Sequence, residues 1–198
     1  MTKGWQETRA TFRHGNLPEA LLGAALVRLE ADGVESLSLR ELARDVGVNH
    51  RAVYRHFPDK LSLLARVGEE GWRRLVRRMK EQIGNKQGED ALIASGVAFF
   101  AFAREHPRLF QLMAGPRVNT EGQFPALEAA IGEALQVFMQ AFLDAGTGPK
   151  VARARTAIFV AALQGVIAQV LHRRLRLAPK KATGEVAAIC QMLIKGLR

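Results

Sequence analysis

The stretch SLSLRELARDVGVNHRAVYRHFPDKLSLL, residues 36–64, decides the fold of this chain. Its first part has the apolar spacing of one buried helix face, at Leu39, Leu42, Ala43 and Val46. Ser38 precedes this helix and Glu41 follows three residues later, which predicts a capping box. Gly47 comes directly after the helix, where a residue with positive φ is favoured. The stretch therefore begins with a short helix and a tight turn.

A second short helix is expected after this turn. Asn49 is a good cap for its start, and Val53 and Phe57, four residues apart, turn inward together. Pro58 ends the helix, because the residue before a proline avoids helical geometry. Asp59 then caps a third helix. Two short helices about a glycine-bearing turn indicate a helix-turn-helix, whose second helix can enter the major groove of DNA.

The outward face of the second helix carries hydrogen-bond donors and positive charge. No Asp or Glu occurs between Val46 and Pro58, so no carboxylate repels a phosphate backbone there. The outward positions are His50, Arg51, Tyr54, Arg55 and His56. This pattern favours a DNA-reading surface. A solvated helix in an all-helical protein is the alternative that the pattern leaves open.

The run L-S-L-R-E-L-A-R-D-V-G-V-N-H-R-A-V-Y-R-H-F-P-D-K resembles the DNA-binding motif of the tetracycline-repressor-like (TetR) family of bacterial transcription regulators. The recurring aromatic and basic positions of that motif are here Tyr54, His56, Phe57 and Lys60. The resemblance covers residues 16–72 well and the remainder more loosely. The run FAREHPRLFQLM, residues 102–113, resembles a family branch with a Trp/His-Gly signature, which residues 159–165 would match with Gln164 at the usual His position.

The resemblance implies a set of DNA-binding residues, which is Arg40, Asn49, His50, Arg51, Ala52, Tyr54, Arg55, His56 and Lys60. Arg40, Tyr54 and Lys60 would contact phosphates, and His56 a phosphate or a base edge. His50 and Arg51 would be the leading base readers. Arg51 is unusual, because many members have a small residue or Pro there, and a guanidinium can bind guanine O6 and N7 together. A phosphate clamp and a surface salt bridge are the alternatives for Arg51. Ala52, where many members have Thr, could touch a thymine methyl group.

Composition limits the class of protein. The 198 residues are 48% hydrophobic, which excludes general disorder, and no apolar run is expected to be long enough to span a bilayer. The 29 basic and 19 acidic side chains give a net charge of +10, which favours a polyanionic partner. The polar, basic N-terminus is not a signal peptide, and the single Cys190 agrees with a reducing cytoplasm. We therefore expect a cytoplasmic protein with no membrane partner.

The expected fold is all-α, with about nine helices in two domains. Residues 1–60 would form a flexible arm and a three-helix DNA-binding domain, and residues 61–198 a helical effector-binding and dimerisation domain. A long helix over residues 59–83 would link the two. Further helices are expected over residues 16–32, 89–105, 107–114, 126–145 and 150–177, followed by a last helix that carries Val186 to Leu197. The arm, residues 1–15, would follow the minor groove of bound DNA.

The second domain is rich in aromatic side chains. A mostly apolar ligand pocket is predicted from Phe99, Phe102, Phe110, Met113, Phe138, Phe142, Phe159 and Gln164. Core packing is the alternative role for each of these residues singly. A homodimer interface is predicted from Ile158, Ala161, Ile167, Leu171, Val186, Ile189, Leu193 and Leu197. The alternative is that both of the helices involved line the core of one chain.

These observations predict a homodimeric, sequence-specific regulator of transcription. It would be a repressor released from a palindromic operator in double-stranded DNA by a small, mostly apolar effector of unknown identity. The alternatives are a basic helical protein that binds DNA without sequence preference, and a helical carrier whose DNA-binding part has lapsed. An enzyme, a cofactor and a metal are not expected, because the nucleotide and hydrolase motifs are missing and the five histidines are scattered.

Overall fold

The computed structural model describes residues 16–119, 121–178 and 181–197, and the expected arm, residues 1–15, lies outside them. Over the described residues the chain is all helical, with nine α-helices, one short 3₁₀ helix and no strand. The elements are α1 (Leu17–Asp32), η2 (Val34–Ser36), α2 (Leu39–Val46), α3 (His50–Tyr54), α4 (Lys60–Ile83), α5 (Gly88–Glu105), α6 (Pro107–Ala114), α7 (Pro125–Asp144), α8 (Pro149–Leu171) and α9 (Ala182–Gly196). The all-α prediction is confirmed.

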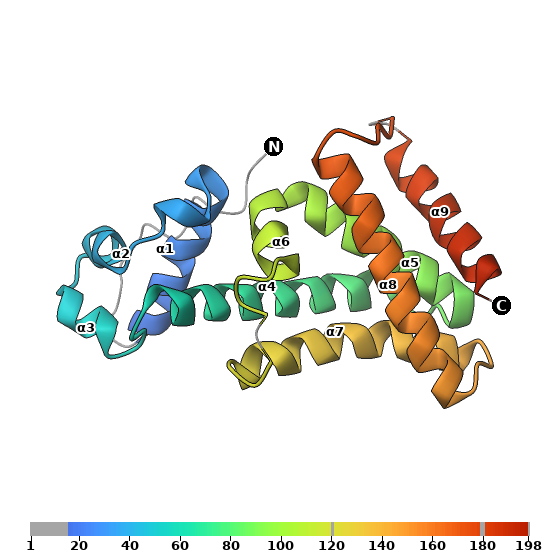
Figure 1. Cartoon of the computed structure of the whole chain (residues 1–198), viewed down its shortest axis with the longest axis horizontal. Helices are drawn as coiled ribbons and strands as arrows, with labels where there is room; N and C mark the ends of the chain where they lie inside the picture. Colours follow the sequence, from blue (N-terminus) through green and yellow to red (C-terminus); the bar gives the residue numbers. More distant parts are fainter. Residues whose placement is uncertain (1–15, 120, 179–180, 198) are drawn as a thin grey trace.

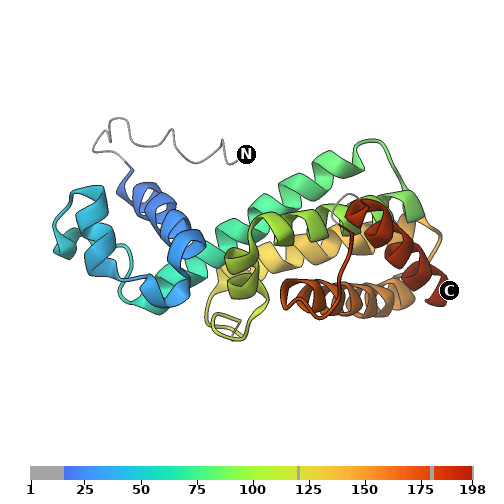
Figure 2. The same cartoon turned by 90° about the horizontal axis from the view of Figure 1, so that it is seen from above.

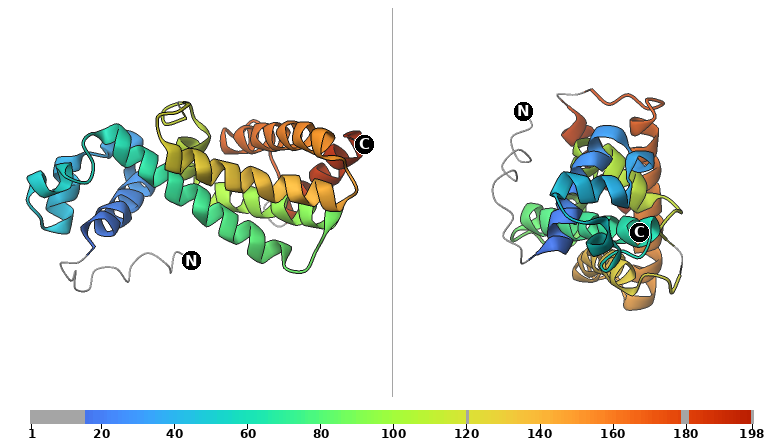
Figure 3. Two further views of the ribbon diagram at one scale, coloured as in Figure 1. Left: turned by 90° about the horizontal axis from the view of Figure 1, so that it is seen from below. Right: turned by 90° about the vertical axis from the view of Figure 1, so that its left-hand side faces the viewer.

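The helices form two groups along an elongated molecule. Helices α1 to α3 make a small unit at one end, and α5 to α9 make a larger unit at the other end (Figure 1). Helix α4 belongs to both groups, because it packs on α1 near its start and on α5 and α7 over the rest of its length. The side-by-side course of α4, α5 and α7 is visible from above and below (Figures 2 and 3).

The ends of the short helices follow from local sequence as predicted. Gly47 adopts the left-handed conformation, with φ of 76°, and ends α2. The side chain of Asn49 accepts a hydrogen bond of 2.9 Å from the backbone N–H of Arg51 and caps α3. Asp59 and Ser62 cap α4 reciprocally, and the Asp59 carboxylate accepts from the Ser62 N–H at 2.7 Å. The turn at Gly47 and the caps at Asn49 and Asp59 fix the chain direction before and after α3.

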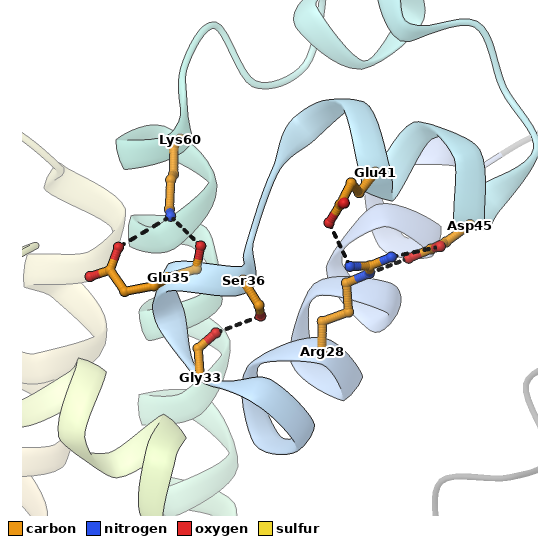
Figure 4. A network of polar contacts seen from close by, with 7 residues as sticks. All are labelled: Arg28, Gly33, Glu35, Ser36, Glu41, Asp45 and Lys60. Carbon is orange, nitrogen blue, oxygen red and sulfur yellow. Dashed lines mark hydrogen bonds and ion pairs between the residues drawn. The ribbon is translucent and has the colours of Figure 1, made fainter.

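The predicted capping box at the start of α2 is wrong. Ser38 is the N-cap residue in extended conformation, but its side chain makes no cap hydrogen bond. Glu41 instead accepts a hydrogen bond of 2.7 Å from the guanidinium of Arg28 on α1, which also binds Asp45 (Figure 4). This hydrogen bond from Arg28 lowers the pKa of Asp45. A charge-assisted bond to another helix has replaced the local cap and ties α1 to α2.

Helix α8 is shorter than expected, and helices α7 and α8 are both more apolar than expected. Helix α8 ends at Leu171 and not near residue 177, because Arg173 takes a positive φ of 59° and the Arg174 N–H bonds back to the Gln169 carbonyl at 2.8 Å. Helices α7 and α8 are also long and apolar enough to cross a membrane, so the expectation that no such run exists is wrong. Two such helices are weak evidence for a membrane, because core helices pass the same test.

The close approach of α5 to α9 supplies a stability test. A Cβ atom on Gly96 would lie 2.5 Å from the Sγ atom of Cys190, which is buried and whose pKa burial raises to about 12. We expect Gly96→Ala to lower the free energy of unfolding in urea by about 1–3 kcal/mol, as overpacking typically does. The matched control is Gly132→Ala on α7, where a Cβ meets nothing within 4 Å, and a gain of about 0.4–1 kcal/mol is expected.

Cys190→Ala removes the sulfur that Gly96→Ala would meet. The double variant should therefore lose less stability than the two single losses added together. Additive losses would mean that Gly96 matters for a reason other than its contact with Cys190.

Candidate nucleic-acid interface

The predicted DNA-binding residues lie on α2, on α3 and its flanking turns, and at the start of α4, and α2 and α3 lie at the free end of the small unit (Figure 1). Helix α3 turns Val53 and Phe57 into the core, with 0% and 6% of their surface exposed. The exposed members of the predicted set are Arg40, Asn49, His50, Arg51, Tyr54, Arg55 and His56, while Ala52 and Lys60 are half-buried. Arg55 and His56 lie in the turn after α3, because α3 ends sooner than the expected helix. The structure thus presents nearly the whole set to solvent.

This surface is positively charged because most carboxylates of the small unit are paired with cations, and not because basic side chains outnumber acidic ones. Residues 16–60 hold seven acidic and six basic side chains. Most of the carboxylates have cationic partners, such as Glu19, which binds Arg66 at 3.1 Å. In contrast, four arginines form no ion pair within the described ranges, and these are Arg40, Arg44, Arg51 and Arg55. Free cations and a half-exposed Tyr54 are therefore what an approaching phosphate backbone would meet.

Lys60 is the exception among the predicted phosphate contacts. Its ammonium lies 3.4 Å from the carbonyl oxygen of Glu35 and 3.8 Å from the carboxylate of the same residue (Figure 4). The Glu35 carboxylate also accepts a hydrogen bond of 2.7 Å from Arg117, and this bond is the main cause of its lowered pKa. A contact between Lys60 and a phosphate stays a prediction, and it requires Lys60 to leave Glu35.

A polar junction joins the small unit to α6, and sequence reasoning missed it. The carboxylate of Glu30 on α1 accepts a hydrogen bond of 3.0 Å from the backbone N–H of Leu109, in the first turn of α6. Arg108 donates to the Glu30 carbonyl at 3.1 Å. Glu30 therefore caps α6 from another helix, and a carboxylate is favoured at a helix N-terminus. These partners are 78 and 79 residues apart in the chain, so no local pattern signals them.

His106, at the start of α6, is half-buried, and we expect its titration to make the stability of the junction depend on pH. Burial lowers the pKa of His106. Glu30 and Glu105 oppose this shift, and Arg74 and Arg78 reinforce it. Because the folded pKa lies below the unfolded one, the unfolded chain binds more protons and stability falls as the pH falls. We expect the Tm to drop as the pH is lowered from about 7.5 to about 5.5, the histidine range.

The variant His106→Gln should show a smaller drop in Tm over the same pH range, because it removes the titrating imidazole. His172→Gln, at an exposed histidine, should keep the drop seen in the unchanged protein. Identical pH profiles for the unchanged protein and His106→Gln would contradict this assignment.

The predicted pocket residues lie in the core of the larger unit. All are buried except Gln164, which is half-buried. Several of their rings pack edge to face, with centroids 5.5 Å apart for Phe99 and Phe110 and 5.9 Å apart for Phe142 and Phe159. Two buried polar atoms were not predicted from the sequence. The Nε1 donor of Trp72 and the Oγ1 hydroxyl of Thr156 have no hydrogen-bond partner among the described residues.

The predicted dimer residues divide between the core and the surface. Ile167 and Val186 are 1% and 0% exposed, so both pack in the core of a single chain, and a contact of either with a second chain stays a prediction. Ile158 is 54% exposed and Ala161 is exposed, while Leu171, Ile189, Leu193 and Leu197 are half-buried. Much of the outward face of α8 is apolar, with Val151, Ala154, Ala157, Ile158, Ala161 and Gly165, while the exposed polar residues Lys150, Arg153 and Gln169 lie toward its two ends.

A capped helix-turn-helix with unpaired cations, joined by one long helix to a second helical unit, defines a DNA-binding protein of the helix-turn-helix class. Residues 21–67 match the family model "Bacterial regulatory proteins, tetR family". Residues 92–193 match the model "Tetracyclin repressor-like, C-terminal domain", which covers more than half of the chain. The chain therefore belongs to the tetR family of bacterial regulatory proteins. It is a DNA-binding regulator of transcription and not an enzyme.

Solved structures share this fold over nearly the whole chain. A protein with unknown function from Rhodococcus sp. RHA1 is 28% identical, with a TM-score of 0.81 and coverage of 94% of this chain and 98% of that one. A transcriptional regulator from Rhodococcus sp. Rha1 is 23% identical, with a TM-score of 0.68 and coverage of 91% and 97%. A TetR variant from Acinetobacter baumannii AYE, solved with minocycline, is 21% identical, with a TM-score of 0.65 and coverage of 94% and 96%.

Proposed function

We propose that the protein is a homodimeric, sequence-specific repressor, which leaves a palindromic operator when a small, mostly apolar ligand binds its larger unit. The observation that carries the proposal is the surface of α3 and the turn after it, where Arg51, Tyr54 and Arg55 are exposed and neither arginine forms an ion pair with a described carboxylate. Residues 1–60 would form the DNA-binding domain, and residues 61–198 the effector-binding and dimerisation domain. Because such a protein would act on bacterial DNA, we expect it in the cytoplasm.

On DNA, each residue of the interface has a proposed role. His50 and Arg51, in the first turn of α3, read base edges in the major groove. Arg40 and Tyr54 bind phosphates and fix the position of α3, and Lys60 joins them after leaving Glu35. Ala52, Arg55, His56 and Asn49 complete the contact surface.

The outward face of α8 supports the homodimer. Val151 and Ile158 are 49% and 54% exposed. Helix α8 is long and strongly apolar, although only a minor part of it is buried within one chain. Monomeric proteins rarely leave a large contiguous apolar face in water, and such a face commonly marks a contact with a partner. A two-fold pair of chains would place two α3 helices about 34–36 Å apart, one turn of DNA, on a palindromic site.

Two unpartnered polar atoms support a ligand in the larger unit. A buried donor without a partner costs about 1–3 kcal/mol, and Trp72 Nε1 and Thr156 Oγ1 both lie among buried side chains that are mostly apolar. An apolar effector with hydrogen-bond acceptors would satisfy them, beside the aromatic residues Phe99, Phe138 and Phe159. The minocycline complex of the Acinetobacter protein is a case of a small molecule held by this fold. A coupling of about 1–3 kcal/mol would suffice to weaken operator binding.

Selection of bound sequences from random duplex DNA tests the proposal. We expect one palindromic sequence to be enriched and to bind about 10³-fold or more tightly than unrelated DNA at the same salt concentration. Equal affinity for all sequences, with the same salt dependence, would support the alternative of a basic protein without sequence preference. Loss of all DNA affinity at low salt would support a helical carrier.

A further inference from the structure

We propose a second ligand site, for a small organic carboxylate, in a cavity between the DNA-binding unit and α6. The cavity has a volume of about 530 Å³ and is lined from both sides of the junction. Gly33 and Val34, which follow α1, form one wall. Gln111 and Leu112 on α6 and Pro116 in the loop after it form much of the other wall. Ligand sites occur preferentially at such boundaries between domains.

Two guanidinium groups at this cavity select a negative charge. Arg108 and Arg117 both line it and both are exposed. Arg108 donates to the carbonyl oxygen of Glu30 at 3.1 Å and has no ion pair with any described carboxylate, since the Glu30 carboxylate binds the Leu109 N–H instead. Each guanidinium has five N–H donors, so donors remain for a ligand. A planar carboxylate matches their geometry.

The cations near this cavity outnumber the carboxylates that pair with them. The single carboxylate of Glu35 serves both Arg117, at 2.7 Å, and Lys60, at 3.8 Å. A bound carboxylate would supply the missing negative charge for Arg108 and Arg117. The apolar side chains of Val34 and Leu112 beside these cations favour a short hydrocarbon tail over a bare inorganic anion.

Binding of a ligand at this site should also affect DNA binding, and this part of the inference rests on the proposed function. A ligand bound to Arg117 competes with Glu35 for that guanidinium. Glu35 is then attracted more strongly to Lys60, its remaining cation. Lys60 is held away from DNA phosphate, so operator affinity should fall. This route differs from that of an effector in the aromatic core, because it acts directly at the start of α4.

Isothermal titration calorimetry of the full chain without DNA tests the site itself, with hexanoate as the probe. We expect one hexanoate to bind each chain, and its neutral isostere hexanamide and inorganic phosphate to bind more weakly. In the double variant Arg108→Gln/Arg117→Gln the affinity for hexanoate should fall about tenfold or more, because charge-assisted hydrogen bonds are lost. Arg104→Gln, which removes an exposed arginine that lies over the Phe100 ring on α5, should leave the affinity unchanged.

Equal binding of hexanoate to the unchanged protein and the double variant would overturn the proposal, as would no binding of hexanoate at all. Tighter binding of phosphate than of hexanoate would replace the organic ligand by an inorganic anion and also overturn it. Amide NMR shifts give a second readout, because hexanoate should perturb Gly33, Val34 and Gly115 at the cavity wall. Calorimetry needs no operator, so failure here is separate from failure of the proposed repressor function.

Discussion

Replacing Arg51 by Ala is expected to relax the preference of the protein at one base position in each half of its operator. Binding to the selected sequence should weaken by about 1–3 kcal/mol per half-site, because that is the discrimination that one bidentate contact to guanine provides. Arg51 is suited to this contact, since it is exposed near the start of α3 and its backbone N–H is already engaged by the Asn49 cap. The fold should not change, because no described side chain depends on the Arg51 guanidinium.

Repeating the selection from random duplexes with Arg51→Ala measures this effect, and Tyr54→Phe is the matched control. Tyr54→Phe removes only a hydroxyl, so loss of its phosphate contact should weaken all sequences about equally. If Arg51→Ala also weakened all sequences equally, Arg51 would be a phosphate clamp. If it changed nothing, Arg51 would be an ordinary surface arginine.

Ile158→Glu is expected to have the largest effect, because it places a charge in the centre of the apolar face of α8. In a homodimer the two copies of this carboxylate would be buried without partners, which strongly disfavours association. The variant should be monomeric by analytical ultracentrifugation. Its affinity for a palindromic operator should fall by about 10²- to 10⁴-fold, since two linked contacts become two independent ones.

The fold of a single chain should survive Ile158→Glu, because this side chain is 54% exposed. Leu135→Glu supplies a matched control, since it makes a similar change on α7 at a side chain that is 39% exposed and lies outside the α8 face. This control should remain dimeric. A dimeric Ile158→Glu variant would show that α8 is not the interface, and a monomeric unchanged protein would refute the homodimer.

Local sequence determined the DNA-binding motif of this protein. Gly47 ends α2, Asn49 caps α3 and Asp59 caps α4, each through a bond to a backbone group within a few residues. Such interactions depend on neighbours in the chain, so their residue types and spacing are sufficient to predict them. The inward turn of Val53 and Phe57 was predictable for the same reason, because helical periodicity places them on one face.

Only the tertiary structure decided which side chains from different helices come into contact and which helix faces are covered. Glu41 has the right spacing for a local cap, but Arg28 from α1 is close enough to bind it. Ile167 and Ile158 are equally apolar in sequence, yet one is covered by the core and the other is exposed on α8. The junction of Glu30 with Leu109 joins residues 79 positions apart. Long-range contacts depend on how whole helices pack, and a helical repeat specifies which residues share a face but not which face another helix will cover.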